Sequence, residues 1–189
     1  MKVLIVVDMQ KDFIDGSLGT KEAQAIVSCV SDIVKHSASN DTFILFTKDT
    51  HTENYMNTLE GKNLPIPHCI KGTAGHDIIP QVFMSYVDNK EFFANTKNGT
   101  VDALIIEKPT FGSTELQKIL STLDKTEGVT DITLVGLCTG ICVMSNAILA
   151  KATLPEAQVN VVADCCACVT PESHKTALEA MKLCQINII

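Results

Sequence analysis

The chain has 189 residues, 46% of them hydrophobic and 20% charged, and its 22 acidic and 15 basic side chains give a net charge of −7. This length suits a single domain with one well-filled core, which we expect to span residues 1–189. The acidic balance argues against nucleic acid or an anionic membrane surface as a partner, because both attract basic side chains.

Six near-continuous apolar segments are predicted as strands, at residues 3–7, 43–47, 103–107, 132–135, 159–163 and 186–189. Continuous apolar runs are typical of strands that are buried on both faces. Helices are predicted between several of these strands, at 21–35, 114–123, 141–152 and 172–183. Strands that alternate with helices predict an α/β fold in which helices cover both faces of a parallel sheet.

The stretch from residue 49 to residue 100 differs from the rest, because it is rich in Asn, Gly and Pro. These residue types interrupt regular structure. A connection this long usually has a functional role, so we expect it to fold over a site.

Polar residues follow four of the predicted strands. Asp8 follows the first strand, Asp49 and His51 the second, Lys108 the third, and the run 138–142 the fourth. The carboxyl ends of parallel strands meet at one crevice, where ligands bind. Asp8 and Lys108 are expected to pair there, either as part of an active site or only as a salt bridge that closes the sheet.

Cys142 lies at the start of the helix predicted at 141–152, just after the run 136–140. A helix N-terminus offers free N–H groups and a positive dipole end, which lower the pKa of a thiol and can hold an oxyanion. The alternative is a small buried cysteine that packs a turn. Asp8 and Lys108 in the same crevice favour a nucleophile with a carboxylate to take its proton.

Five segments in register resemble a known superfamily. The runs 7–13, 107–109 and 135–143 are similar to the three motif regions of the isochorismatase-like cysteine hydrolases, and the run 49–51, Glu60 and the run 67–75 are similar to nicotinamidases. The resemblance implies a three-layer αβα sandwich with a six-stranded, mostly parallel sheet. It also implies a catalytic triad of Asp8, Lys108 and Cys142 and a cis peptide bond between Leu137 and Cys138.

The resemblance further implies a divalent metal ion, zinc in the first place or else iron or manganese, held by Asp49, His51, His68 and Glu60. The residues themselves support such a site. Asp49 and His51 are two positions apart in an extended segment and therefore point the same way. With Glu60 and His68 they form a mixed nitrogen and oxygen set that suits a first-row transition ion, whereas an Asp-x-His pair alone can be a simple hydrogen bond.

The implied activity is hydrolysis of a small carboxamide, nicotinamide first, to nicotinate and ammonia through a cysteine thioester, which would serve NAD salvage. The backbone N–H groups of Cys138 and Cys142 would hold the oxyanion. Phe13 matches an aromatic residue that lines the family's pocket, and Phe111 either packs on the substrate ring or belongs to the core. Two alternatives stay open: a cysteine hydrolase of a ureido or carbamoyl compound, and a thiol-sensing module without turnover.

Three departures from the family concern the substrate. Gly140 stands where nicotinamidases usually carry Asp, and the chain has no Trp to stack on a pyridine ring. The segment after Lys108 is also shorter than usual, which is expected to move Phe111 closer.

The remaining cysteines and histidines are given structural roles. Eight cysteines in a chain of this length are too few for a disulfide scaffold, so we interpret them as reduced thiols. The run 165–168 is predicted as small buried residues rather than a soft metal cluster, and Cys138 and Cys142 are not expected to form a redox pair. His36, His76 and His174 are predicted at the surface. With no long apolar run and no leader pattern, the protein is expected to be cytoplasmic, and the resemblance favours a homo-oligomer.

Overall fold

The computed structural model describes residues 1–38, 40, 42–87 and 104–189. Within them the sheet has the strand order β3-β2-β1-β4-β5-β6, and every neighbouring pair is parallel. The strands are β1 (Lys2–Val7), β2 (Thr42–Asp49), β3 (Leu104–Lys108), β4 (Asp131–Leu137), β5 (Gln158–Ala167) and β6 (Asn187–Ile188). The predicted αβα fold is confirmed, and the sheet is entirely parallel rather than mostly so.

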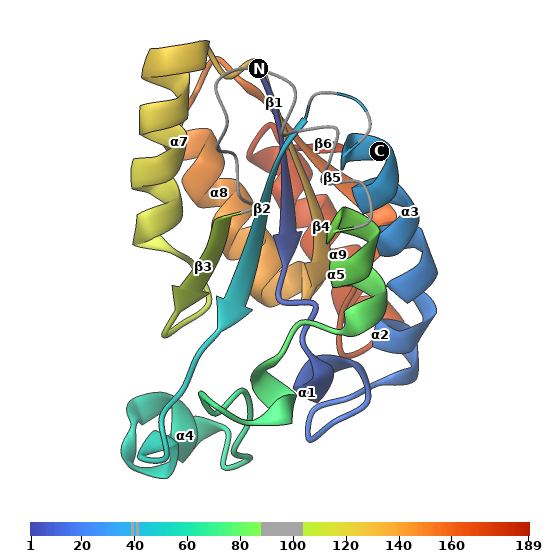
Figure 1. Cartoon of the computed structure of the whole chain (residues 1–189), viewed down its shortest axis with the longest axis vertical. Helices are drawn as coiled ribbons and strands as arrows, with labels where there is room; N and C mark the ends of the chain where they lie inside the picture. The colour runs from blue at the N-terminus through green and yellow to red at the C-terminus, as the bar shows by residue number, and fades with distance from the viewer. Residues whose placement is uncertain (39, 41, 88–103) are drawn as a thin grey trace.

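Helices cover both faces of the sheet and bury its alternating side chains (Figure 1). Val3, Ile5 and Val7 of β1 face one core with α7 (Thr114–Glu127), α8 (Met144–Thr153) and α9 (Pro171–Leu183). Leu4 and Val6 face the other core with α2 (Lys21–Ala25), α3 (Val27–Ala38) and α5 (Pro80–Val87). Burial on both sides explains why the strands read as continuous apolar runs.

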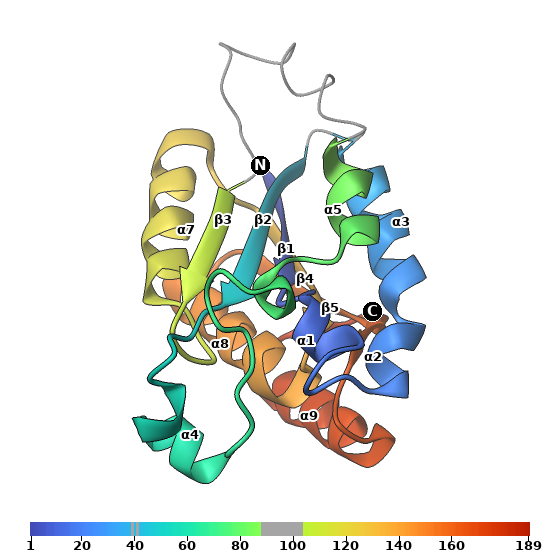
Figure 2. The ribbon, with the colours of Figure 1, turned by 60° about the horizontal axis from the view of Figure 1, so that its bottom comes forward.

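Short elements gather beyond the carboxyl ends of the strands (Figure 2). They are α1 (Lys11–Ile14), η1 (Tyr55–Asn57), α4 (Leu59–Asn63) and η2 (Ala74–His76). The stretch predicted to fold over a site therefore lies at the ligand-binding edge as far as Ile79, whereas α5 beyond it covers one face of the sheet. The remainder of the stretch, together with the first residue of the predicted strand 103–107, lies outside the described residues. Along the described parts of the chain, no helix is both long and apolar enough to cross a membrane.

Two predicted helices differ from expectation: one is divided into two helices, and the other begins later in the chain. The helix predicted at 21–35 is interrupted at Ile26, between the end of α2 at Ala25 and the start of α3 at Val27. Thr20 starts α2 as predicted, because its hydroxyl accepts a hydrogen bond from the Ala23 N–H at 3.0 Å. The helix predicted at 141–152 begins only at Met144, since a π-helical turn, η3 (Thr139–Val143), precedes it.

The end of β4 has an unusual backbone. Gly136 has a φ of 114°, and a Cβ atom there would lie 2.2 Å from the Val7 carbonyl oxygen of β1. Only glycine therefore allows β4 to lie this close to β1 at that point. The next peptide bond, between Leu137 and Cys138, is cis, which confirms the expectation from the resemblance.

The interpretation of all eight cysteines as reduced thiols was wrong. Cys29 of α3 and Cys165 of β5 form a disulfide, and their Cα atoms are 5.4 Å apart, within the range that such a bond spans. The packing of α3 against β5 brings together two residues that are 136 positions apart in the sequence, which composition cannot reveal. Cys138 and Cys142 are both free thiols, and the absence of redox chemistry between them stays a prediction.

Candidate active site

Asp8, Lys108 and Cys142 meet at the carboxyl edge of the sheet. Asp8 directly follows β1, Lys108 ends β3, and Cys142 lies in the turn after β4. The Lys108 ammonium nitrogen is 2.6 Å from Asp8 Oδ2 and 3.5 Å from Cys142 Sγ. The structure therefore brings the three residues of the predicted triad together.

The charged pair of this triad is almost completely removed from water. Asp8 and Lys108 are each 1% exposed. The Thr47 hydroxyl donates to Asp8 Oδ1 at 2.6 Å, and Lys108 donates to the Thr110 carbonyl at 3.2 Å. These contacts fix the pair, because a buried charge without partners is strongly unfavourable. Asp8 also has a φ of 48°, a left-handed conformation that is often found at functional sites.

The acidity of Cys142 differs from the prediction made for a helix N-terminus. Burial raises the pKa of the Cys142 thiol well above its ordinary value, and the neighbouring Asp8 carboxylate adds to this, while Lys108 opposes it. Burial likewise raises the pKa of Asp8, in spite of Lys108. Burial and a nearby negative charge therefore dominate the acidity of this thiol. The resting thiol is therefore neutral, so a base is needed to form the thiolate.

Asn146 holds the turn that carries Cys142 in place through hydrogen bonds, and the sequence analysis did not identify this residue. Its side-chain amide donates to the Cys142 carbonyl at 2.8 Å and to the Phe111 carbonyl at 3.2 Å, and its oxygen accepts from the Ser113 N–H at 3.0 Å. Asn146 is fully buried. An Asn on the buried face of a helix, one turn after a candidate nucleophile, is the signal that would have identified it.

Helix α9 supports the same turn from the other side. The buried Thr139 hydroxyl is 2.8 Å from His174 Nδ1. A Cβ atom at Gly140 would lie 3.2 Å from the Ala177 Cβ and 3.6 Å from Cys168 Sγ, so a larger residue would press on α9. Close packing of α9 thus accounts for glycine at position 140. His174, which was predicted at the surface, is half-buried, and its ring nitrogen meets the Thr139 hydroxyl.

A second polar group contains the four predicted metal ligands, Asp49, His51, Glu60 and His68. One ligand atom from each residue lies within 4.8 Å of the others. Asp49 Oδ2 is 3.0 Å from His51 Nε2 and 3.3 Å from His68 Nε2. The two imidazoles and Lys108 outweigh the effect of burial and hold the pKa of Asp49 below its ordinary value. Burial and the facing Asp49 carboxylate raise the pKa of Glu60, and a cation would relieve their repulsion.

Two observations show that this group fits a metal ion. His51 Nε2 is buried and makes no well-oriented hydrogen bond, although Asp49 Oδ2 is only 3.0 Å away and other ligand atoms surround it. His68 donates from Nδ1 to the Ile66 carbonyl at 2.8 Å, which leaves Nε2 free to bind a metal. Such a hydrogen bond from the second ring nitrogen is usual for metal-ligating histidines. Two imidazoles and two carboxylates suit a first-row transition ion.

Buried polar side chains hold the segment that carries these ligands. Gln10 donates to the carbonyls of Asp49 at 2.8 Å and His76 at 2.9 Å, and accepts from the Asp49 N–H at 2.7 Å. The Asp12 carboxylate accepts from the Cys69 N–H at 2.7 Å, next to His68. His76 is buried, with Nε2 at 2.9 Å from the Thr50 hydroxyl, so its predicted surface position was wrong. The Gln10 side-chain amide donates to the His76 carbonyl in η2 and to the Asp49 carbonyl at the end of β2. Gln10 therefore holds η2 next to the end of β2.

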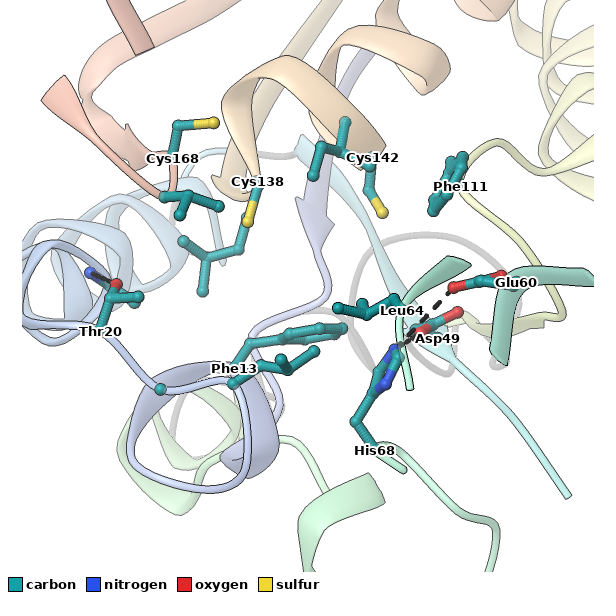
Figure 3. Close-up of a pocket in the computed structure, with 16 residues that line it drawn as sticks. Phe13, Thr20, Asp49, Glu60, Leu64, His68, Phe111, Cys138, Cys142 and Cys168 are labelled. Atoms are coloured by element: carbon teal, nitrogen blue, oxygen red, sulfur yellow. Dashed lines mark hydrogen bonds and ion pairs between the residues drawn. The ribbon is translucent and has the colours of Figure 1, made fainter. Parts of the chain in front are cut away.

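Both groups open into one cavity of about 440 Å³ (Figure 3). Asp49, Glu60 and His68 line one part of it, and Cys142 lines its wall. Phe13 and Phe111 line it as well, and the Phe13 ring packs 5.5 Å from that of His68. The cavity therefore offers a thiol, an apolar slot for a flat ring and a group of metal ligands to one small molecule.

Comparisons with known proteins agree with this arrangement. The sequence matches the Isochorismatase domain family over residues 2–189. It is 27% identical over 193 residues to the nicotinamidase/pyrazinamidase of Mycobacterium tuberculosis, which covers 100% of this chain and 98% of that protein. The structure resembles the pyrazinamidase/nicotinamidase of Streptococcus mutans, with a TM-score of 0.81, 28% identity and 100% coverage of both chains. It also resembles the pyrazinamidase of Pyrococcus horikoshii, solved in complex with zinc, with a TM-score of 0.76, 28% identity and coverage of 100% of this chain and 98% of that one.

Proposed function

Because the chain belongs to the isochorismatase family, we propose that it hydrolyses nicotinamide to nicotinate and ammonia through a thioester on Cys142. The observation that carries the proposal is the single cavity shared by the Cys142 thiol and the Asp49, His51, Glu60 and His68 group. The names of relatives that cover the whole chain support the same substrate. Such an activity would serve NAD salvage.

The first half of the reaction forms the thioester. Asp8 takes the proton of the Cys142 thiol, and the sulfur attacks the amide carbon to form a carbon–sulfur bond. The negative oxygen of this intermediate is held by the backbone N–H groups of Cys138 and Cys142. The carbon–nitrogen bond then breaks as the nitrogen takes the proton from Asp8 and leaves as ammonia.

The second half of the reaction returns the enzyme to its starting state. Asp8 removes a proton from water, and the water oxygen bonds to the thioester carbon. The carbon–sulfur bond breaks, and the sulfur of Cys142 recovers a proton from Asp8. Lys108 remains charged throughout, since Asp8, the nearby thiol and Asp49 raise its pKa against the effect of burial. It keeps the carboxylate of Asp8 fixed beside the sulfur.

Asp49, His51, Glu60 and His68 would hold a divalent ion, zinc in the first place or else iron or manganese. Such an ion would supply a Lewis acid for the ring nitrogen of the substrate. The protein's own side chains complete the binding site, because Phe13 and Phe111 offer apolar surface to a flat ring. The cytoplasmic location and the homo-oligomer stay predictions, which cell fractionation and light scattering would test.

The decisive experiment measures ammonia release from nicotinamide by the protein loaded with zinc, iron or manganese, before and after alkylation of its thiols. We expect turnover that alkylation abolishes, together with an acyl adduct on Cys142 in quenched samples by mass spectrometry. Turnover that survives alkylation of Cys142 would refute the thioester. A protein that ignores nicotinamide but hydrolyses a ureido compound would establish the alternative hydrolase.

A further inference from the structure

The cavity extends beyond Cys142 and the metal-ligand group to two further segments of the chain. Its ionisable metal-ligand residues, Asp49, Glu60 and His68, lie together at one end, with Cys142 and Phe13 near them (Figure 3). Thr20 and Cys168 lie at the opposite end of the view. The total volume of about 440 Å³ falls in the range of roughly 300–1,000 Å³ that is typical of pockets for drug-sized ligands.

The far end is formed by two segments that take no part in the proposed reaction. The connection from α1 to α2 contributes Leu18, Gly19 and Thr20, and the connection from β5 to α9 contributes Cys168 and Val169. None of these residues carries a charge. The Thr20 hydroxyl already accepts a hydrogen bond from the Ala23 N–H, so its main polar contact is made within the protein.

The wall between the two ends is also uncharged. The Cys138 side chain lines the cavity between Phe13 and Cys168 in the view of Figure 3. Burial raises the pKa of the Cys138 thiol to about 12, so this side chain is a neutral, weakly polar surface at physiological pH. An apolar group on a bound molecule can therefore extend from the reacting centre to Leu18 and Val169 without burying a charge.

We infer that the far end, formed by Leu18, Gly19, Thr20, Cys168 and Val169, is a subsite for an apolar substituent on the substrate ring. This inference rests on the proposed function and deepens it. The substrate class it names is pyridine carboxamides that carry an alkyl or aryl group on the side of the ring facing away from Asp49, Glu60 and His68. Unsubstituted nicotinamide fills only the other end of the cavity.

The test uses a series of nicotinamides substituted at the ring carbon that is meta to both the nitrogen and the carboxamide-bearing carbon. The substituents are hydrogen, methyl, ethyl and propyl, and the metal-loaded wild-type protein is assayed with each one. We expect kcat/KM to rise about threefold to fourfold with each added carbon, mainly through KM, because each methylene leaves water for an apolar wall. A ratio of propyl to unsubstituted substrate at or below one would overturn the subsite.

Matched variants locate the effect. Leu18→Asn and Val169→Asn each place an amide at the far end, so the propyl to unsubstituted ratio of kcat/KM should fall several-fold in both. Leu183→Asn makes the same change on an exposed leucine at the end of α9 and should keep the wild-type ratio. Val169 is 59% exposed, so its replacement tests the subsite even if Leu18→Asn fails to fold. If both variants keep the wild-type ratio of kcat/KM between the propyl and the unsubstituted substrate, the substituent does not contact Leu18 and Val169. That result would overturn the inference.

Failure of this inference can be told apart from failure of the proposed function. Turnover of nicotinamide with no gain from substituents rejects the subsite alone. If no pyridine carboxamide is hydrolysed, the proposed function fails. The subsite is then tested by the rise in melting temperature that the propyl compound and nicotinamide each cause in the Cys142→Ala protein. A larger shift with the propyl compound than with nicotinamide would support the apolar end, and an equal shift would reject it.

Discussion

Two segments supply the reactive groups of the cavity, and they are built in opposite ways. The turn 138–143 is short, follows β4 directly, and is held by Asn146 of α8 and His174 of α9. The segment 50–79 between β2 and α5 is long, and only short helices occur in it. Its shape depends on side chains from elsewhere, above all Gln10 and Asp12.

This difference separates two kinds of preorganisation. The nucleophile is positioned by regular elements with a buried core behind them, so its geometry does not require a bound ion. The metal ligands are positioned by a few tertiary hydrogen bonds and repel one another where Asp49 faces Glu60, so an ion would complete their arrangement. Damage to the turn should therefore appear in kcat, and damage to the long segment in metal content and KM.

The largest effect is expected from Cys142→Ala, which removes the nucleophile and leaves both segments in place. We expect kcat to fall by at least about a thousandfold, because no thioester can form. Circular dichroism and thermal melting should stay close to wild type. Cys138→Ala is the matched control and should cost less than about tenfold, since the proposed role of Cys138 belongs to its backbone. Equal losses from both variants would indicate a dithiol and contradict a hydrolase.

Asp8→Asn is expected to be nearly as severe, with a loss of about a hundredfold to ten-thousandfold in kcat, because an amide cannot accept the thiol proton. The wild-type pH profile sharpens this assignment. Asp8 must be ionised to act as a base, and its pKa is raised, so kcat/KM should fall as the pH decreases through a value above that of an ordinary aspartate. A rate that stays constant down to the ordinary range would remove Asp8 from the role of base.

His51→Ala tests the long segment by itself. Loss of this imidazole should leave three ligands and strip the ion, which metal analysis of the purified protein measures directly. KM for nicotinamide should rise by more than about tenfold, whereas benzamide, which has no ring nitrogen, should lose much less. A wild-type protein that contains no metal and still hydrolyses nicotinamide would refute the site. Equal losses with both substrates would give the ion a purely structural role.

The comparison also explains what the sequence could predict. Asp8, Lys108 and Cys142 follow buried strands, and parallel topology brings such positions to one edge, so their meeting was predictable from the pattern alone. Glu60 and His68 lie in an irregular segment where spacing does not determine position, and the resemblance to a known family supplied them.

The features that were not predicted depend on tertiary packing. The disulfide between Cys29 and Cys165 forms because α3 lies on β5, and the pKa of Cys142 is raised because the turn is buried. The contacts of Gln10 and Asn146 are hydrogen bonds across elements, which no local pattern encodes.

The smallest effect is expected where α9 supports the turn, and it tests whether that support reaches the chemistry. Thr139→Val and His174→Ala each remove one side of the same 2.8 Å contact. A single hydrogen bond contributes about 0.5–1.5 kcal/mol, so each variant should lower kcat about twofold to tenfold and leave KM and metal content unchanged.

Because the two side chains share one interaction, the double variant should lose no more than either single variant. His36→Ala on α3 is the control, since this histidine is exposed, far from the turn, and hydrogen-bonded to the nearby Asn40, and it should leave kcat and KM unchanged. A purely structural role for the contact would lower the melting temperature without changing kcat. If the kcat losses of the two single variants multiply in the double variant, or if KM changes, Thr139 and His174 act separately. The contact with α9 would then not determine the geometry of the turn.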